Sequence, residues 1–145
     1  MEVSIKEKVK SVQMSFGRCT MNPDFMKEFY DEFLASHPSV KDYFKNTDMQ
    51  VQRALLKNGL TYLIMFANGS ALAKGKMERL GESHDKNHMN INPQLYKYWV
   101  NSLLKVIKMQ DSKMTKELFD AWKEVILLGV KKMISMHNAH AQTQA

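Results

Sequence analysis

The sequence predicts an all-α protein of one domain with about seven helices. Apolar residues recur every three or four positions along most of the 145 residues, and no segment shows the sustained alternation of a β-strand. The gaps between the helical segments are short, and the chain is long enough to bury a sizeable core. We expect the domain to cover residues 1–138 and residues 139–145 to form a frayed tail, because that end lacks periodicity.

Three short helices are expected in the first third of the chain. An amphipathic helix over about 3–19 places Val9 and Val12 among lysines. Asn22 and Pro23 then have the cap-then-proline pattern of a helix start, which predicts a helix over 23–37 with an aromatic stripe. Pro38 begins a third helix that ends at 44.

Four longer helices are expected to follow. Thr47 or Asp48 caps a helix that Asn68 and Gly69 end. The remaining helices are predicted at about 71–86, 93–109 and 114–137, where the apolar residues return with helical spacing.

Composition excludes several classes of protein. Hydrophobic residues make up 44% and charged residues 25%, as in soluble globular proteins. The single Cys19 excludes an internal disulfide framework, and the charged N-terminus lacks a signal core, so we expect a cytoplasmic protein. No apolar run could span a bilayer, and we expect no membrane partner.

The net charge of +6 raises the question of nucleic acid. However, the lysines are spread over every predicted helix, and no nucleic-acid-binding motif is present. A solvated basic surface explains the charge, and we expect no nucleic-acid partner.

The stretch from Leu80 to Trp99 contains the clearest candidate site. His84 ends an apolar helix, and a polar corner with His88 and Ile91 leads to the next one. A neutral imidazole between apolar helices is a ready metal ligand. The alternative is a surface histidine near a helix end, since short motifs match by chance.

The order of these features resembles a bacterial single-domain globin, close to the globin half of the flavohaemoglobins. The string FYDEFLASHPSVKDYF resembles the family segment that carries a distal tyrosine and a haem-wedging phenylalanine, here Tyr30 and Phe44. The QxxxL pair of the family falls on Gln52 and Leu56, and the proximal ligand falls on His84. The strings INPQLY at 91–96 and AW at 121–122 also match, so the resemblance covers nearly the whole chain.

The resemblance implies a three-over-three helical sandwich, shortened between the third helix and the distal helix, with haem b (iron protoporphyrin IX) bound through His84. The residues that we expect around the haem are Tyr30, Phe44, Gln52, Arg53, Leu56, Leu80, His88, Ile91, Tyr96 and Trp99. Arg53 and His88 are candidates for the haem propionates, or are simply solvated.

Tyr30 and Gln52 would both face a bound diatomic ligand. A phenol and an amide can each donate a hydrogen bond to the partial charge on O2, which predicts slow O2 release. The alternatives are a core aromatic residue for Tyr30 and a solvated helix-start residue for Gln52. No histidine lies between His37 and His84, so we expect five-coordinate ferrous iron.

Three functions remain open on the sequence, together with the alternative of a helical scaffold that binds no haem. The first is reversible binding of O2, and of NO or CO, by a monomer or homodimer. The second is nitric oxide dioxygenation, which would need a separate reductase because the match covers only the globin half of the flavohaemoglobins. The third is a haem-based gas sensor or interaction module. Where flavohaemoglobins have a glutamate near the proximal histidine, this chain has His137, which puts peroxidase-like chemistry in doubt.

Overall fold

The computed structural model describes residues 4–84 and 92–143, with the side chains of 81–84 and 136–143 left out. This part of the chain contains seven helices and no strand, which confirms the all-α prediction. None of these helices is both long enough and apolar enough to span a membrane. The helices are α1 (Ile5–Thr20), α2 (Phe25–Ser36), α3 (Pro38–Tyr43), α4 (Met49–Ala67), α5 (Ala71–His84), α6 (Leu95–Gln110) and α7 (Lys116–Thr143).

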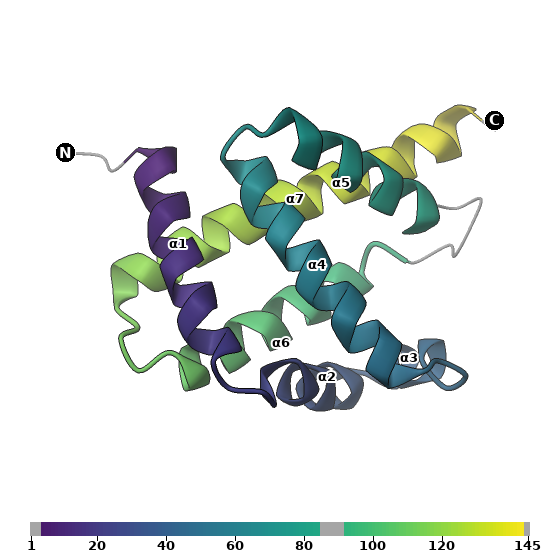
Figure 1. Cartoon of the computed structure of the whole chain (residues 1–145). Helices are drawn as coiled ribbons and strands as arrows, with labels where there is room; N and C mark the ends of the chain where they lie inside the picture. Colours follow the sequence, from purple (N-terminus) through teal and green to yellow (C-terminus); the bar gives the residue numbers. More distant parts are fainter. Residues whose placement is uncertain (1–3, 85–91, 144–145) are drawn as a thin grey trace.

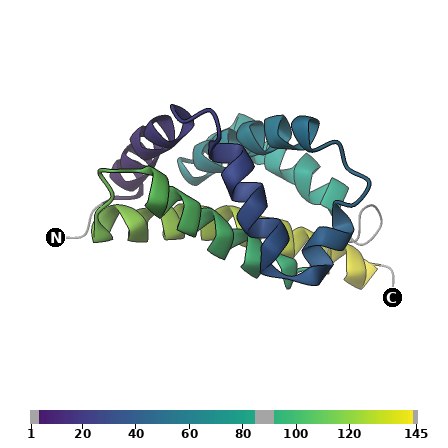
Figure 2. The same cartoon turned by 90° about the horizontal axis from the view of Figure 1, so that it is seen from below.

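The helices form two layers with the core between them. In the view of Figure 2, α1, α4 and α5 lie above α6 and α7, and α2 crosses from one layer toward the other. α7 packs against α1, α4 and α5, whereas α2 packs mainly against α6. Figure 1 shows α4 running diagonally across the front of the molecule, with α3 at its lower end. Only residues 44–48 join α3 to α4, which agrees with the shortened region predicted between the third helix and the distal helix.

The ends of α4 follow their predicted caps. The Asp48 carboxylate accepts hydrogen bonds from the backbone N–H groups of Gln50 and Val51 at 3.0 and 3.3 Å. At the other end Gly69 has φ of 84°, and the N–H groups of residues 69 and 70 bond back to the carbonyls of 66 and 65. This is a Schellman motif, which needs a left-handed residue and therefore favours glycine.

Two helices begin later than their prolines predict. We expected Pro23 and Pro93 at first helical positions, but α2 and α6 begin at residues 25 and 95. In each case the preceding asparagine accepts a hydrogen bond from the N–H two residues on, at 3.0 Å for Asn22 and 2.9 Å for Asn92. This Asx turn includes the proline, so the helix begins after it.

The last helix is longer than predicted. α7 ends at Thr143 and not near 137, so it continues through residues for which the sequence predicted an irregular tail. Near its middle, a Cβ added to Gly129 would lie only 2.6 Å from Cγ of Leu63 on α4. The absence of a side chain at Gly129 therefore allows α4 and α7 to cross closely.

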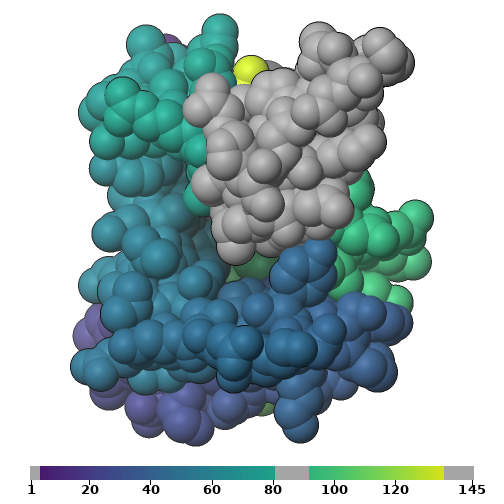
Figure 3. Space-filling model, turned by 90° about the vertical axis from the view of Figure 1, so that its right-hand side faces the viewer, coloured from purple at the N-terminus to yellow at the C-terminus, as the bar shows by residue number. Residues whose placement is uncertain are grey.

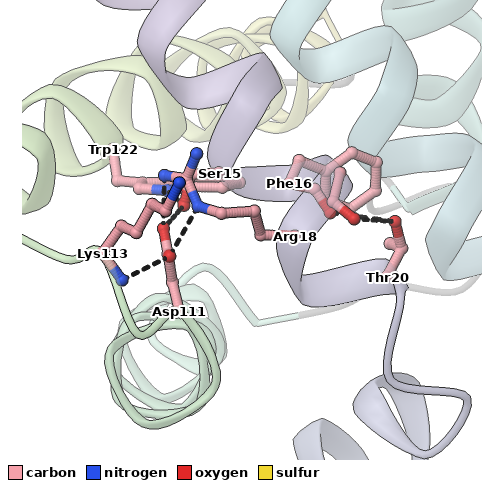
Figure 4. A network of polar contacts seen from close by, with 8 residues as sticks. Ser15, Phe16, Arg18, Thr20, Asp111, Lys113 and Trp122 are labelled. Atoms are coloured by element: carbon pink, nitrogen blue, oxygen red, sulfur yellow. Dashed lines mark hydrogen bonds and ion pairs between the residues drawn. The ribbon is translucent and has the colours of Figure 1, made fainter.

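A buried polar network joins α1 to the corner between α6 and α7 (Figure 4). Asp111 is 2% exposed, and its carboxylate accepts from Ser15 Oγ at 2.6 Å and from Arg18 Nε and Nη2 at 2.7 and 2.8 Å. The backbone N–H of Lys113 donates a further bond at 2.9 Å, and Trp122 Nε1 donates to Ser15 Oγ at 2.9 Å. One carboxylate thus connects three helices.

These donors stabilise the ionised form of Asp111. The Arg18 guanidinium makes the largest contribution, and it lowers the pKa of the carboxyl from 3.8 to about 2 against the opposing effect of burial. The folded pKa lies below the unfolded one, so the contribution to stability is present above about pH 4 and is lost as the pH falls toward 2. The shift corresponds to about 2 kcal/mol.

We predict that Asp111→Asn lowers the free energy of unfolding by about 2–3 kcal/mol near neutral pH. The loss should shrink as the pH approaches about 3, because the wild-type carboxyl is then partly protonated in the unfolded chain. Urea unfolding at the two pH values measures both effects. Glu124→Gln, which breaks the exposed ion pair with Lys8, is the control and should cost less than about 1 kcal/mol. An equal loss for Asp111→Asn at both pH values would contradict the assigned role.

Candidate functional site

Tyr30 lies at the centre of an aromatic cluster on the inward face of α2. Its side chain is 4% exposed, and its ring lies edge-to-face with those of Phe29 and Phe44, with centroids 5.0 and 5.7 Å apart. Phe33 packs beside both Tyr30 and Phe44. The aromatic stripe predicted for this helix therefore fixes the position of one phenol.

The first turn of α4 brings Gln52 to this phenol. The Asp48 cap fixes the start of the helix, and Gln52 Nε2 donates a hydrogen bond to Tyr30 Oη at 3.1 Å. Leu56 follows one turn later and is buried. The structure thus brings Gln52 into contact with Tyr30, and Leu56 lies one helical turn from Gln52.

The direction of this bond leaves the Tyr30 proton free to donate. The phenol oxygen accepts from the amide, and no described residue accepts from the phenol. Burial raises the pKa of Tyr30 to about 12, and the Gln52 hydrogen bond opposes this only in part. The phenol is therefore neutral near pH 7, with a buried O–H that has no acceptor among the described residues.

Phe44 is held in place by a contact that the sequence did not reveal. His37 caps α3 by accepting from the N–H of Ser39 at 3.0 Å, and its ring stacks on Tyr98 of α6 at 4.9 Å between centroids. α3 is thereby tied to α6, and Phe44 at its end packs half-buried against Tyr30. Apart from the position of His37 before Pro38, nothing in the sequence indicates that it caps α3 and contacts Tyr98.

Three further predicted residues lie on α5 and α6. Leu80, Tyr96 and Trp99 are half-buried and pack against the core, with the Trp99 ring 6.0 Å from that of Phe29. Burial raises the pKa of the Tyr96 phenol to about 12. Figure 3 shows α3 in blue, α4 and α5 in teal and the start of α6 in green on one side of the molecule.

The remaining candidates are placed only in part. His84 is the last residue of α5, but its side chain is not among those that the structure describes. His88 and Ile91 lie entirely outside the described residues. Arg53 is half-buried on α4 and has no ion-pair partner within the described residues. The metal-ligand and propionate assignments therefore stay predictions.

We predict that wild-type protein loses more stability than Tyr30→Phe when the pH rises from about 10 to about 12. The folded pKa of Tyr30 is raised, so its stabilising contribution is present below pH 10 and is lost as the pH passes through the folded value. The difference should be about 1–2 kcal/mol by urea unfolding at the two pH values. Parallel losses in the two proteins would show that the phenol is not buried as described.

Comparisons with known proteins agree with this architecture. The globin family model matches residues 27–133. A crystal structure from Pseudomonas aeruginosa PAO1, whose protein is described as structurally highly homologous to a human hemoglobin, superposes with a TM-score of 0.86 at 35% identity. That match covers 90% of this chain and 98% of the other. No curated protein gave a significant match.

The family match extends over most of the chain, and the similar structure spans nearly all of it. The predicted resemblance and the predicted fold are confirmed, and the chain belongs to the globin family.

Proposed function

We propose that this globin binds haem b through His84 and holds O2 reversibly beside Tyr30 and Gln52. The observation that carries the proposal is the buried Tyr30 hydroxyl, which accepts from Gln52 and keeps its own proton for another acceptor. A buried donor without an acceptor is uncommon in folded proteins and is favoured where a ligand completes it.

The described residues fit a haem. Phe44, Leu80, Tyr96 and Trp99 are half-buried aromatic or aliphatic side chains on three different segments, each packed on the core with part of its surface uncovered. Such surfaces suit a large, flat, apolar group, and the single buried phenol supplies the polar contact that orients a small ligand. Haem iron would supply the atom to which O2 binds, with His84 as its protein ligand.

The amide and the phenol would act in sequence. Gln52 donates to the phenol oxygen, which polarises the O–H bond and makes Tyr30 a stronger donor. Tyr30 would then donate its hydrogen to a bound ligand that carries partial negative charge. Leu56 and Phe44 exclude water from that contact, which strengthens it. This arrangement favours slow release over rapid transport.

The same slow release supports nitric oxide dioxygenation as the second candidate function. O2 held for long periods can react with NO to give nitrate, after which a separate reductase must return one electron. NO consumption and nitrate formation with an added reductant would distinguish this activity from simple O2 binding.

We predict that His84→Gly abolishes stoichiometric haem binding or leaves it loose and restored by free imidazole. His84 is the last residue of α5, and a ligand that binds only the native state also adds its binding free energy to stability. Haem titration followed by absorbance measures the effect, and His88→Ala is the matched control. Loss of haem in His88→Ala but not in His84→Gly would move the iron ligand to the other histidine.

We predict that Tyr30→Phe increases the rate of O2 dissociation about ten- to hundred-fold and changes O2 association much less. The variant removes one hydrogen bond to a charged acceptor, which is worth about 1.5–3 kcal/mol. CO dissociation should respond far less, because CO carries little charge on its outer atom. Stopped-flow O2 dissociation measures the rates.

Gln52→Leu should act in the same direction as Tyr30→Phe but more weakly, since Gln52 acts through the phenol. The two changes should be less than additive in the double variant, because the side chains share one network. Unchanged O2 dissociation in Tyr30→Phe would show that Tyr30 is a packing residue only.

A further inference from the structure

The outward side of α4 exposes apolar residues, and Lys57 is the only fully exposed charge on this helix. Its inward side carries the buried Leu56, Leu60, Leu63 and Ile64, and the opposite side carries Val51 and Leu55, which are 55% and 56% exposed. Tyr62 falls on the same stripe by helical periodicity. The other residues on this side are neutral, among them Ala54, Asn58 and Thr61. A solvent-facing helix usually places its charges there.

The edge of α5 beside α4 continues this surface. Leu72, Lys76 and Arg79 have the spacing of one helical stripe, and Leu72 is 62% exposed. Lys76 Nζ lies 5.7 Å from the ring centroid of Tyr62, so the stripe on α5 meets the stripe on α4. We call the six residues Val51, Leu55, Tyr62, Leu72, Lys76 and Arg79 the α4–α5 face.

The charges around the α4–α5 face have one sign. The sequence has no carboxylate between Asp48 and Glu78, but it has Arg53, Lys57, Lys74 and Lys76 in that interval. Glu78 itself pairs with Lys132 of α7 at 3.6 Å. Arg79 and the four cations of the interval have no ion-pair partner in the described part of the chain. An apolar strip therefore lies between unpaired positive charges.

This charge pattern favours an acidic partner protein over a second copy of the chain. A second copy of this chain packed on the same face would bring two sets of cations together, which opposes self-association. A protein with an apolar contact surrounded by carboxylates would instead pair with every cation of the face.

The position of the face relates it to the proposed pocket. On α4, Val51 and Leu55 come directly before Gln52 and Leu56. Consecutive residues lie about 100° apart around a helix, so the two pairs point in different directions from neighbouring positions. A partner on the outer side would therefore lie close to the pocket without covering it.

We propose that the α4–α5 face docks an electron-donor protein whose contact surface is rich in carboxylates. The inference rests on the proposed function, because a haem that binds O2 must be kept in the ferrous state. The partner supplies one electron to ferric haem and leaves oxidised by one electron.

A flavodoxin, as an acidic one-electron flavoprotein, is the probe. Two measurements are made at low ionic strength: the second-order rate at which the reduced flavodoxin reduces ferric haem in the globin, and the binding of the oxidised flavodoxin by isothermal titration. The variant Lys57→Glu/Arg79→Glu reverses two exposed cations, one on α4 and one on α5. We expect it to lower the reduction rate about ten-fold or more and to weaken binding similarly.

The matched control is Lys6→Glu/Lys10→Glu, which makes the same change in net charge on exposed positions of α1. It should change the rate by no more than about two-fold, because its charges lie away from the face. Leu55→Ser should weaken binding about five-fold by removing apolar contact. An uncharged free flavin in its reduced form should reduce all variants at the wild-type rate.

Equal effects of the two charge reversals would overturn the proposal, since they would reflect net charge alone. A wild-type protein that sediments as a dimer, and that Leu55→Ser converts to a monomer, would assign the face to a second copy and overturn it too. If the purified protein takes up no haem, the proposed function fails, whereas the titration with flavodoxin still decides whether the face binds an acidic protein.

Discussion

A buried carboxylate in the corner between α6 and α7 holds the scaffold together. Asp111 follows the C-terminus of α6, where the helix dipole disfavours a negative charge, so it needs donors from elsewhere in the chain. α1 provides them through Ser15 and Arg18, and Trp122 of α7 donates to the same serine. These bonds set α1 against α7, and α7 is the helix on which α4 and α5 then pack. The candidate pocket is built on that support.

The polarity of the pocket follows from a single hydrogen-bond direction. If the Tyr30 phenol donated to Gln52, its proton would be used within the protein; instead the amide donates and the phenol keeps its proton. Burial holds the phenol neutral, so the donor persists across the physiological pH range. The Tyr30 hydroxyl thus keeps a hydrogen that a ligand at the proposed site would accept, and it lies among apolar side chains.

Helical periodicity and capping residues were sufficient to predict the helices and the limits of α4. The contact between Tyr30 and Gln52 was available only through the family resemblance, because nothing in the spacing of residues 30 and 52 says that their helices meet. Helix starts at Pro23 and Pro93 were misplaced, since one Asn-Pro pattern suits both a cap and an Asx turn.

Two contacts were missed because their partners are far apart in the sequence. Asp111 lies in the gap between two predicted helices, and its ion pair with Arg18 joins residues 93 positions apart. Its unfavourable place at a helix C-terminus was the available signal. The stacking of His37 on Tyr98 likewise depends on how α3 meets α6.

The close crossing at Gly129 links a remote position to the contact between Tyr30 and Gln52. Any side chain there must displace Leu63, and Leu63 belongs to the same rigid helix as Gln52, three turns away. A larger residue at 129 would require Leu63 or α4 itself to shift, and a shift of α4 would change the distance between the Gln52 amide and the Tyr30 phenol. Variation at one helix crossing could therefore alter that hydrogen bond while both of its residues stay the same.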